Sequence, residues 1–272
     1  MINVVKQKTG AVSFLHVCEA ESFSNTKPTV IFVHGFQSVK ENNLHYAYLL
    51  AEKGFRVILP DCIHHGDRDS GLKSQQMMQA FWEIVIQTVH EIELIKNHLT
   101  ESGLSDEADI GVAGTSMGGI VTFGALKRYP WIKAAVSLMG CPSYQDFARY
   151  KVDKFLEAGF ALPFSDEQLE SYYAKLKPYD LASDPSSLNV RPLLCWHGKR
   201  DTEVPIDPLL TFVNVNKGYY KNKPNNIKVI VDEYADHKVS REGVLATVDW
   251  FAEHLQQSER EKERYHAGSI KR

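Results

Sequence analysis

A serine flanked by glycines is the first feature of this sequence that could carry chemistry. The stretch from Gly114 to Gly119, GTSMGG, fits the pattern G-x-S-x-G and lies between an apolar run, ADIGVA, and a run with helical spacing, GIVTFGALKRY. A serine at such a junction of strand and helix must sit on a sharp turn, and small neighbours prevent clashes there. The motif predicts Ser116 as a nucleophile, although a glycine-rich loop that packs a helix on a sheet, or cradles a phosphate, would fit the same letters.

Two residues further along the chain can supply the acid and the base that a serine nucleophile needs. Asp201 follows the apolar run RPLLCWHG, and His237 follows the run NIKVIVDEY, so the chain order is serine, acid, histidine. Sites in open α/β sheets lie outside the carboxyl ends of the strands, where residues from three strand ends can meet. We therefore expect Ser116, Asp201 and His237 to form a catalytic triad.

Other carboxylates and histidines lie close to these positions. Glu203 and Asp207 share the loop of Asp201, but Asp207 is expected to cap the next helix and Glu203 to be solvated. Asp236 directly precedes the expected base, and consecutive side chains usually diverge. His197 falls within a strand pattern, which favours a packed side chain over a catalytic one.

A short motif after the first buried run, TVIFV, could complete the site. His34, Gly35 and Phe36 suit a loop that stabilises the oxyanion formed when a serine attacks a carbonyl. The donors would be the backbone N–H groups of Phe36 and Met117. A strand that simply ends at a glycine would look the same, so this motif supports the site only beside the serine.

Residues 61–67, DCIHHGD, place two histidines between two aspartates, which raises the question of a metal. A zinc site needs three or four converging ligands, and adjacent histidines in extended chain point in opposite directions. We therefore expect neither a metal nor another cofactor. The stretch is predicted to be a turn in which His65 and Arg68 hold neighbouring loops near the active site by hydrogen bonds.

The pattern of apolar runs indicates how these residues are positioned. The runs expected to be parallel strands are TVIFVHG, FRVILPD, ADIGVAG, IKAAVSLMG, RPLLCWHG and NIKVIVDEY. Helical spacing recurs between them, from about Leu44 to Lys53 and from Lys73 to Leu99, and again after the last run. INVVKQ and AVSFLHV precede them and are expected to form an antiparallel hairpin. The alternation predicts one α/β domain over residues 1–272 with a mostly parallel, doubly wound sheet.

Two segments depart from this alternation. Residues 142–190 carry helical segments around Tyr144 to Glu157 and Asp166 to Lys175 with many aromatic residues, and they are expected to form a small helical cap over an acyl pocket. Residues 257–272 are charged and poor in apolar residues, which predicts a C-terminal tail.

Composition restricts the classes of function. A net charge of -3 and 43% hydrophobic residues are typical of a globular protein and do not predict nucleic-acid binding. No run approaches the roughly 20 apolar residues of a membrane span, and no secretory signal is evident, so a cytoplasmic location is expected. The cysteines lack any CxxC pair, which predicts reduced, buried thiols. The partners expected are a small-molecule ester and, as a possibility, a second copy in a homodimer.

Taken together, the motifs resemble those of the α/β-hydrolases. HGF, GTSMGG, HGKRD-x-x-VP and ADH are spread from His34 to His237 and are similar to the prolyl-oligopeptidase-related branch, especially small bacterial esterases of the YitV/YjfP kind. In that branch a D-x-x-x-H-G-x-R segment follows the second parallel strand, as Asp61 to Arg68 does here. The resemblance implies the α/β-hydrolase fold, the triad named above, and oxyanion donors from Phe36 and Met117. It does not imply a peptidase, because this chain has no room for a propeller domain.

The activity expected is that of a serine carboxylesterase acting on short- to medium-chain acyl esters through an acyl-enzyme. An acyl-aminoacyl peptidase, a thioesterase or a lipase would use the same triad. A hydrolase-fold protein that binds a small molecule without catalysis is the alternative from another class.

Overall fold

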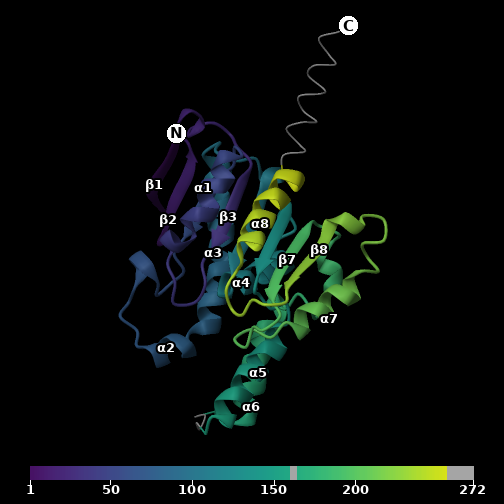
Figure 1. The fold of residues 1–272 in the computed structure, drawn as a ribbon. Helices are drawn as coiled ribbons and strands as arrows, with labels where there is room; N and C mark the ends of the chain where they lie inside the picture. The colour runs from purple at the N-terminus through teal and green to yellow at the C-terminus, as the bar shows by residue number, and fades with distance from the viewer. Residues whose placement is uncertain (160–163, 256–272) are drawn as a thin grey trace.

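The computed structural model describes residues 1–159 and 164–255. An eight-stranded sheet runs through it, with the strands in the order β1-β2-β4-β3-β5-β6-β7-β8 (Figure 1). β1 (Ile2–Thr9) and β2 (Val12–Glu19) form an antiparallel hairpin that turns at Gly10, whose φ of 54° favours glycine. β2 also pairs antiparallel with β4, and the strands from β3 to β8 are mutually parallel. The hairpin and the mostly parallel sheet are both confirmed.

Each predicted parallel strand forms. Their bounds are β3 Thr29–Val33, β4 Arg56–Pro60, β5 Ile110–Thr115, β6 Ala134–Leu138, β7 Leu193–Gly198 and β8 Ile227–Asp232. β3 to β7 are buried almost throughout because helices cover both of their faces, which explains their continuous apolar letters. β8 is the edge strand and is only partly buried.

Helices cover the sheet on two sides. The helices are α1 Leu44–Glu52, α2 Ser74–Gln79, α3 Phe81–Glu101, α4 Met117–Arg128, α5 Tyr144–Glu157, α6 Asp166–Leu176, α7 Asp207–Asn216 and α8 Arg241–His254. Buried residues of α3, α4 and α7 share one apolar core with one face of the sheet, and those of α1 and α8 share a second core with the other face. In Figure 1, α8 crosses in front of the sheet. The doubly wound architecture is therefore confirmed.

The helix predicted from Lys73 to Leu99 is wrong in one respect, because the chain breaks it into α2 and α3 at Ala80. The Ala80 N–H donates to Gln76 O at 2.9 Å, which closes α2. Only Met77 is buried in α2, whereas α3 turns Trp82 into the core. The apolar positions of the two helices stay in phase across the break, so their spacing alone could not reveal it.

The segment between β6 and β7 contains α5 and α6, as predicted. In Figure 1 the two helices extend below the sheet, beyond the carboxyl ends of the parallel strands. Tyr144 Oη donates to Ile120 O of α4 at 2.6 Å and so anchors the start of α5. Arg149 of α5 and Glu170 of α6 form a bidentate ion pair. That residues 142–190 act as a cap stays a prediction.

Three further expectations concern the whole chain. All the cysteines are buried free thiols, as predicted. Within residues 1–159 and 164–255, none of the helices combines the length and the apolar character that a membrane crossing needs. The charged tail predicted at residues 257–272 lies outside the described residues.

Candidate active site

Ser116 occupies a tight turn between β5 and α4. Its φ of 54° and ψ of -114° lie in a region that non-glycine residues rarely adopt, so surrounding packing must hold it there. A Cβ on Gly118 would collide with the backbone of Val33, and a Cβ on Gly114 would collide with Gly118. The glycines of the motif therefore let the turn pack directly on β3 and leave the Ser116 side chain partly exposed.

The loops after β5, β7 and β8 bring the three predicted residues together. His237 Nε2 lies 2.7 Å from Ser116 Oγ, and His237 Nδ1 lies 2.7 Å from Asp201 Oδ2. An ionised carboxylate only accepts hydrogen bonds, so Nδ1 carries the proton and Nε2 accepts from the serine hydroxyl. This arrangement matches the geometry with which a histidine activates a serine.

Asp201 is fixed from both of its oxygens. Its side chain is fully buried, and Oδ1 accepts from the backbone N–H groups of Glu203 at 2.9 Å and Val204 at 3.0 Å. Burial alone would raise the pKa of the Asp201 carboxyl, but hydrogen bonds from His197 and His237 outweigh it and hold the pKa well below its usual range. Asp201 is therefore a carboxylate that can orient His237.

The neighbouring carboxylates take no part in this contact. Asp207 is the first residue of α7 and makes no capping hydrogen bond, so the prediction that it caps the helix is wrong. Ile206 occupies the cap position, and Asp207 lies in the first turn, where a negative charge suits the helix dipole. Glu203 is largely exposed, as expected, and lies 3.7 Å from Lys151 of α5.

The two predicted oxyanion donors belong to segments that lie next to Ser116. Met117 is the first residue of α4, where N–H groups have no partner within the helix. Phe36 follows β3 in a loop that packs on the serine, because a Cβ on Gly35 would lie 3.5 Å from Ser116 Cβ. Both backbone N–H groups are therefore carried by segments that touch the serine, as an oxyanion site requires.

Two buried histidines tie the loop that follows β3 and carries Phe36 to the DCIHHGD turn, residues 61–67. His34 Nε2 accepts from the Cys62 N–H at 3.1 Å, and His65 Nε2 accepts from the Gln37 N–H at 3.0 Å. Their Nδ1 atoms lie against the carbonyl oxygens of Gly35, at 2.7 Å, and Ile63, at 2.8 Å, and carry the proton. Burial lowers the pKa of both histidines, which keeps them neutral and able to accept.

A buried lysine makes the third tie. Lys40 Nζ lies 2.6 Å from Asp61 Oδ2 and 2.8 Å from Asp67 Oδ2, and the Lys40 N–H donates to Asp61 Oδ1 at 3.1 Å. Burial lowers the pKa of Lys40, but hydrogen bonds to these carboxylates and to Glu41 outweigh it and raise the pKa above its usual range. Gly66, with a φ of 53°, packs so closely on Asp61 that a Cβ there would collide with the carboxylate. No motif in the sequence marks Lys40 as buried.

The remaining groups of the turn point elsewhere. Arg68 donates to Asp61 O at 2.9 Å and pairs with both carboxylate oxygens of Glu91 at 2.7 Å, which ties the turn to α3. The His64 ring bonds Ser70 Oγ at 2.6 Å, so the two histidines have different partners. In the described part of the chain, His, Cys, Asp and Glu form no group of three or more that could hold a metal ion. The turn braces the loop of Phe36.

α5 reaches both sides of the site. On one side, ring contacts lead from Phe36 to Phe81, with centroids 5.4 Å apart, through the adjacent Trp82 to Phe147 of α5, at 6.3 Å. On the other side, Lys151 of α5 meets Glu203 in the loop of Asp201. α5 therefore connects the loop of Phe36 with the loop of Asp201.

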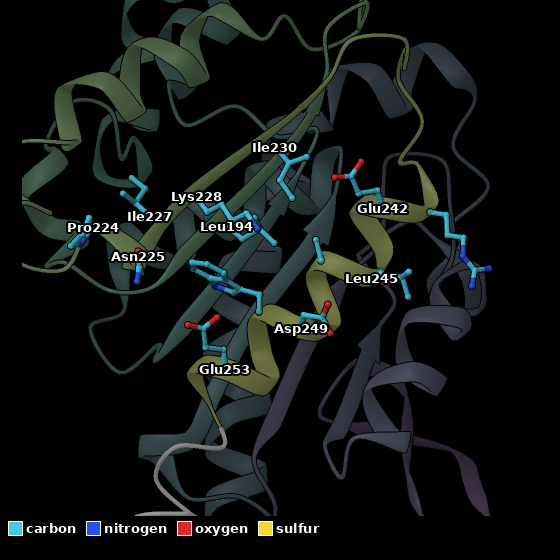
Figure 2. A pocket seen from close by; sticks show the side chains of 13 residues that line it. Leu194, Pro224, Asn225, Ile227, Lys228, Ile230, Glu242, Leu245, Asp249 and Glu253 are labelled. Atoms are coloured by element: carbon cyan, nitrogen blue, oxygen red, sulfur yellow. The ribbon is translucent and has the colours of Figure 1, made fainter.

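Two hollows in the surface lie away from these residues. A groove of about 780 Å³ lies between β8 and α8. Figure 2 shows side chains that line it, such as Ile230 and Leu245. A second hollow, of about 430 Å³, lies between α7 and the start of α5. Neither lining includes Ser116, Asp201 or His237, so the acyl pocket predicted beneath residues 142–190 stays a prediction.

Besides Lys40, the sequence pattern does not reveal the role of His197. The pattern predicts a packed strand residue, and His197 is fully buried, but its Nε2 lies 3.3 Å from Asp201 Oδ2. The available signal was its position at the end of a strand, four residues before the expected acid.

Comparisons with known proteins identify the family and the fold of this chain. The model of the prolyl oligopeptidase family matches residues 41–258. "Putative esterase YitV" of Bacillus subtilis is 44% identical over 94% of this chain and all of its own length. "Esterase YjfP" of Escherichia coli is 27% identical over 94% of this chain and all of its own length. The crystal structure of TT1662 from Thermus thermophilus, 18% identical, has the same fold with a TM-score of 0.73, covering 94% of this chain and 99% of that one. The chain therefore belongs to the prolyl oligopeptidase family and is a serine hydrolase with the α/β-hydrolase fold.

Proposed function

We propose that this protein is a carboxylesterase that hydrolyses short- to medium-chain acyl esters through an acyl-enzyme on Ser116. The observation that carries the proposal is the unbroken chain of contacts from Ser116 Oγ to His237 and on to Asp201, each of 2.7 Å. The likeness to two proteins named as esterases supports an ester as the substrate.

In the first half of the reaction, Ser116 Oγ attacks the ester carbonyl carbon while His237 Nε2 takes the hydroxyl proton. The carbonyl oxygen becomes an oxyanion, which the N–H groups of Phe36 and Met117 stabilise; one such donor contributes about 3 kcal/mol. The bond to the alcohol oxygen then breaks, and His237 returns the proton to that oxygen. The products are the alcohol and an ester between the acyl group and Ser116.

In the second half, water takes the place of the alcohol. His237 Nε2 removes a proton from the water as its oxygen bonds to the acyl carbon, and the same N–H groups stabilise the second oxyanion. The bond to Ser116 Oγ breaks, the proton passes back to the serine, and the carboxylic acid leaves. Asp201 keeps its charge throughout and holds the His237 imidazolium in position.

The small size of the segment of residues 142–190 supports a substrate with a short- to medium-length acyl chain. We propose that this segment is a cap and that α5 closes one side of the acyl site, because α5 contacts both Trp82 and Glu203. Aromatic rings such as Phe36 and Phe81 would then contact the acyl chain. The reduced, buried cysteines fit a cytoplasmic location, where thiols remain reduced.

Reaction with a fluorophosphonate tests whether the protein is an enzyme or only a binder. We expect one covalent adduct, found by mass spectrometry on the peptide that contains Ser116, and no adduct on folded Ser116→Ala. A folded wild-type protein that stays unlabelled would favour a binding protein.

A series of p-nitrophenyl esters from acetate to dodecanoate, with matched acyl thioesters and aminoacyl anilides, tests the substrate class. We expect the highest kcat/KM for esters whose acyl group has about two to eight carbons. Anilides turned over faster than esters would identify an acyl-aminoacyl peptidase instead, and a maximum at the longest esters would identify a lipase.

A further inference from the structure

His197 lies at the end of β7, directly beneath the acid of the site. Its side chain is fully buried. Nε2 lies 2.8 Å from Val204 O and 3.3 Å from Asp201 Oδ2, and both of these oxygens only accept hydrogen bonds. The proton of the neutral ring is therefore on Nε2, and Nδ1 is left as an acceptor.

Nδ1, the other nitrogen of the His197 ring, is different from Nε2. Within residues 1–159 and 164–255, His197 Nδ1 is buried and has no hydrogen-bond partner. A buried polar atom without a partner costs about 1–3 kcal/mol. Its neighbours along β7, Cys195 and Trp196, are apolar and fully buried, so packing alone would favour an apolar side chain at this position. The contacts of Nε2 are what a histidine adds here.

Those contacts complete the surroundings of the carboxylate. Val204, whose carbonyl accepts from His197, donates its own N–H to Asp201 Oδ1 at 3.0 Å. Oδ2 faces two imidazole N–H groups, from His237 at 2.7 Å and from His197 at 3.3 Å. His197 thus holds both the loop that surrounds Asp201 and the oxygen that contacts the base.

We infer that His197 is a positioning residue, whose Nε2–H fixes the Asp201 to Val204 loop and the Asp201 carboxylate so that Oδ2 stays in line with His237 Nδ1. This inference rests on the proposed function of the triad. It assigns His197 no contact with substrate.

The physical consequence is a change in how strongly Asp201 attracts the proton on His237. Without the Nε2–H of His197, less of the negative charge on Oδ2 is neutralised, so the imidazolium is favoured up to a higher pH. The carboxylate also loses one of its restraints, so His237 is less well oriented. Both effects alter catalysis without touching substrate binding.

The other charged groups around this loop remain the same when His197 is replaced. Glu203 pairs with Lys151 at 3.7 Å, and Lys199 pairs with Glu233; both pairs are exposed. The guanidinium of Arg200 lies over the ring of Tyr234, also at the surface. Solvent and salt screen these exposed groups, so they add little to a difference between variants.

The test compares His197→Met, which keeps the approximate volume but has no donor, with His197→Gln, whose amide N–H can reach Val204 O and Asp201 Oδ2. For the Met variant we expect kcat to fall about three- to tenfold, as for the loss of one hydrogen bond, with KM nearly unchanged. The acid limb of its kcat/KM profile should move up by roughly 0.5 pH unit. The Gln variant should restore both values.

His254→Met is the matched control. Like His197, His254 is a buried histidine with one ring nitrogen, here Nε2, that has no hydrogen-bond partner among the described residues. It lies in α8 against Trp250 instead of beside Asp201. It should leave kcat and the pH profile at wild-type values. Should the Met variant fail to fold, His197→Asn, whose amide is too short to reach Val204 O, replaces it in the comparison with Gln.

A Met or Asn variant with wild-type kcat and an unmoved acid limb would overturn the inference. So would a Gln variant as impaired as the Met variant. Failure of the triad itself is a separate result, because Ser116→Ala would then keep its turnover whatever the His197 variants do.

Discussion

The protonation states of single residues determine what the site can do. Asp201 only accepts, so the Nδ1 proton of His237 is committed to it and Nε2 is left for the Ser116 hydroxyl. The same reasoning determines the tautomer of His65, because its Nε2 accepts from a backbone N–H and its Nδ1–H donates to a carbonyl oxygen. Of these two histidines, His237 is the one with a nitrogen available to the serine.

Asp201→Asn tests the orientation of the base. An amide can donate to His237 Nδ1 and so favours the tautomer with the proton on Nε2, which cannot accept from Ser116. We expect kcat for p-nitrophenyl butyrate to fall on the order of 10⁴-fold at pH 7.5, measured on a variant whose folding is verified by its thermal midpoint. A loss smaller than tenfold would mean that Asp201 does not orient the base.

At this scale the sequence reveals residues whose order and neighbours form a motif, and it misses those that act through contact. Ser116 and His237 stand out because glycines or strand ends mark them. His197 and Lys40 do not, because a histidine in an apolar strand and a lysine in a polar loop have the same letters whether or not they meet a carboxylate. The prediction for Asp207 was wrong because an aspartate suits both the cap position and the first turn of a helix.

At the scale of elements, the central pairing is between the loop after β3 and the turn after β4. His34, His65 and Lys40 each connect the two segments, and Arg68 connects the turn to α3. Gln37, whose φ of 57° is unusual for its residue type, is held by the bond to His65. The turn therefore fixes the backbone on which the Phe36 N–H lies.

His65→Ala tests this brace. It leaves the Gln37 N–H without its acceptor, so we expect the free energy of unfolding in urea to fall by about 1–3 kcal/mol. The single-turnover rate of acylation should change less than tenfold. His64→Asn is the control, because His64 lies in the same turn but its ring bonds Ser70 and not the loop of Phe36. Its free energy of unfolding should stay within about 0.5 kcal/mol of the wild-type value. A large loss of rate without a loss of stability would place His65 in the chemical step.

Chelators test the same turn in another way. Both nitrogens of the His65 ring are engaged by the protein, and His64 bonds Ser70, so neither is expected to hold an ion. Dialysis against EDTA should leave kcat for p-nitrophenyl butyrate unchanged. Activity that is lost on chelation and returns with zinc would show that a metal takes part.

At the scale of the whole molecule, one parallel sheet gathers the site at its carboxyl edge. β5, β7 and β8 each end in a loop that carries one of the three predicted residues, and β3 ends in the loop of Phe36. The strands were predictable because burial on both faces leaves continuous apolar letters that end at Gly or Asp. The break at Ala80 and the position of α5 over the loops were not, because tertiary contacts set them.

Acid should weaken the fold, for a reason distributed over the molecule. Burial lowers the pKa of His16, to about 4, and also lowers the pKa of His34 and His65. The unfolded chain takes up protons at these histidines below about pH 6.5, whereas the folded chain does not, so stability falls as the pH drops from about 6.5 toward 4. Urea unfolding at pH 7.5 and 5.5 measures the fall, and His16→Gln should make it smaller. A stability that is flat or rises toward pH 5.5 would contradict this account.

The most direct test of the central claim is the turnover of p-nitrophenyl butyrate by Ser116→Ala, with folding verified by its thermal midpoint. Removal of the hydroxyl leaves His237 and the oxyanion donors in place but takes away the atom that forms the acyl-enzyme. We predict that kcat falls on the order of 10⁴-fold or more, as for the loss of the nucleophile in other triads. Turnover within tenfold of wild type, in a folded variant, would contradict it.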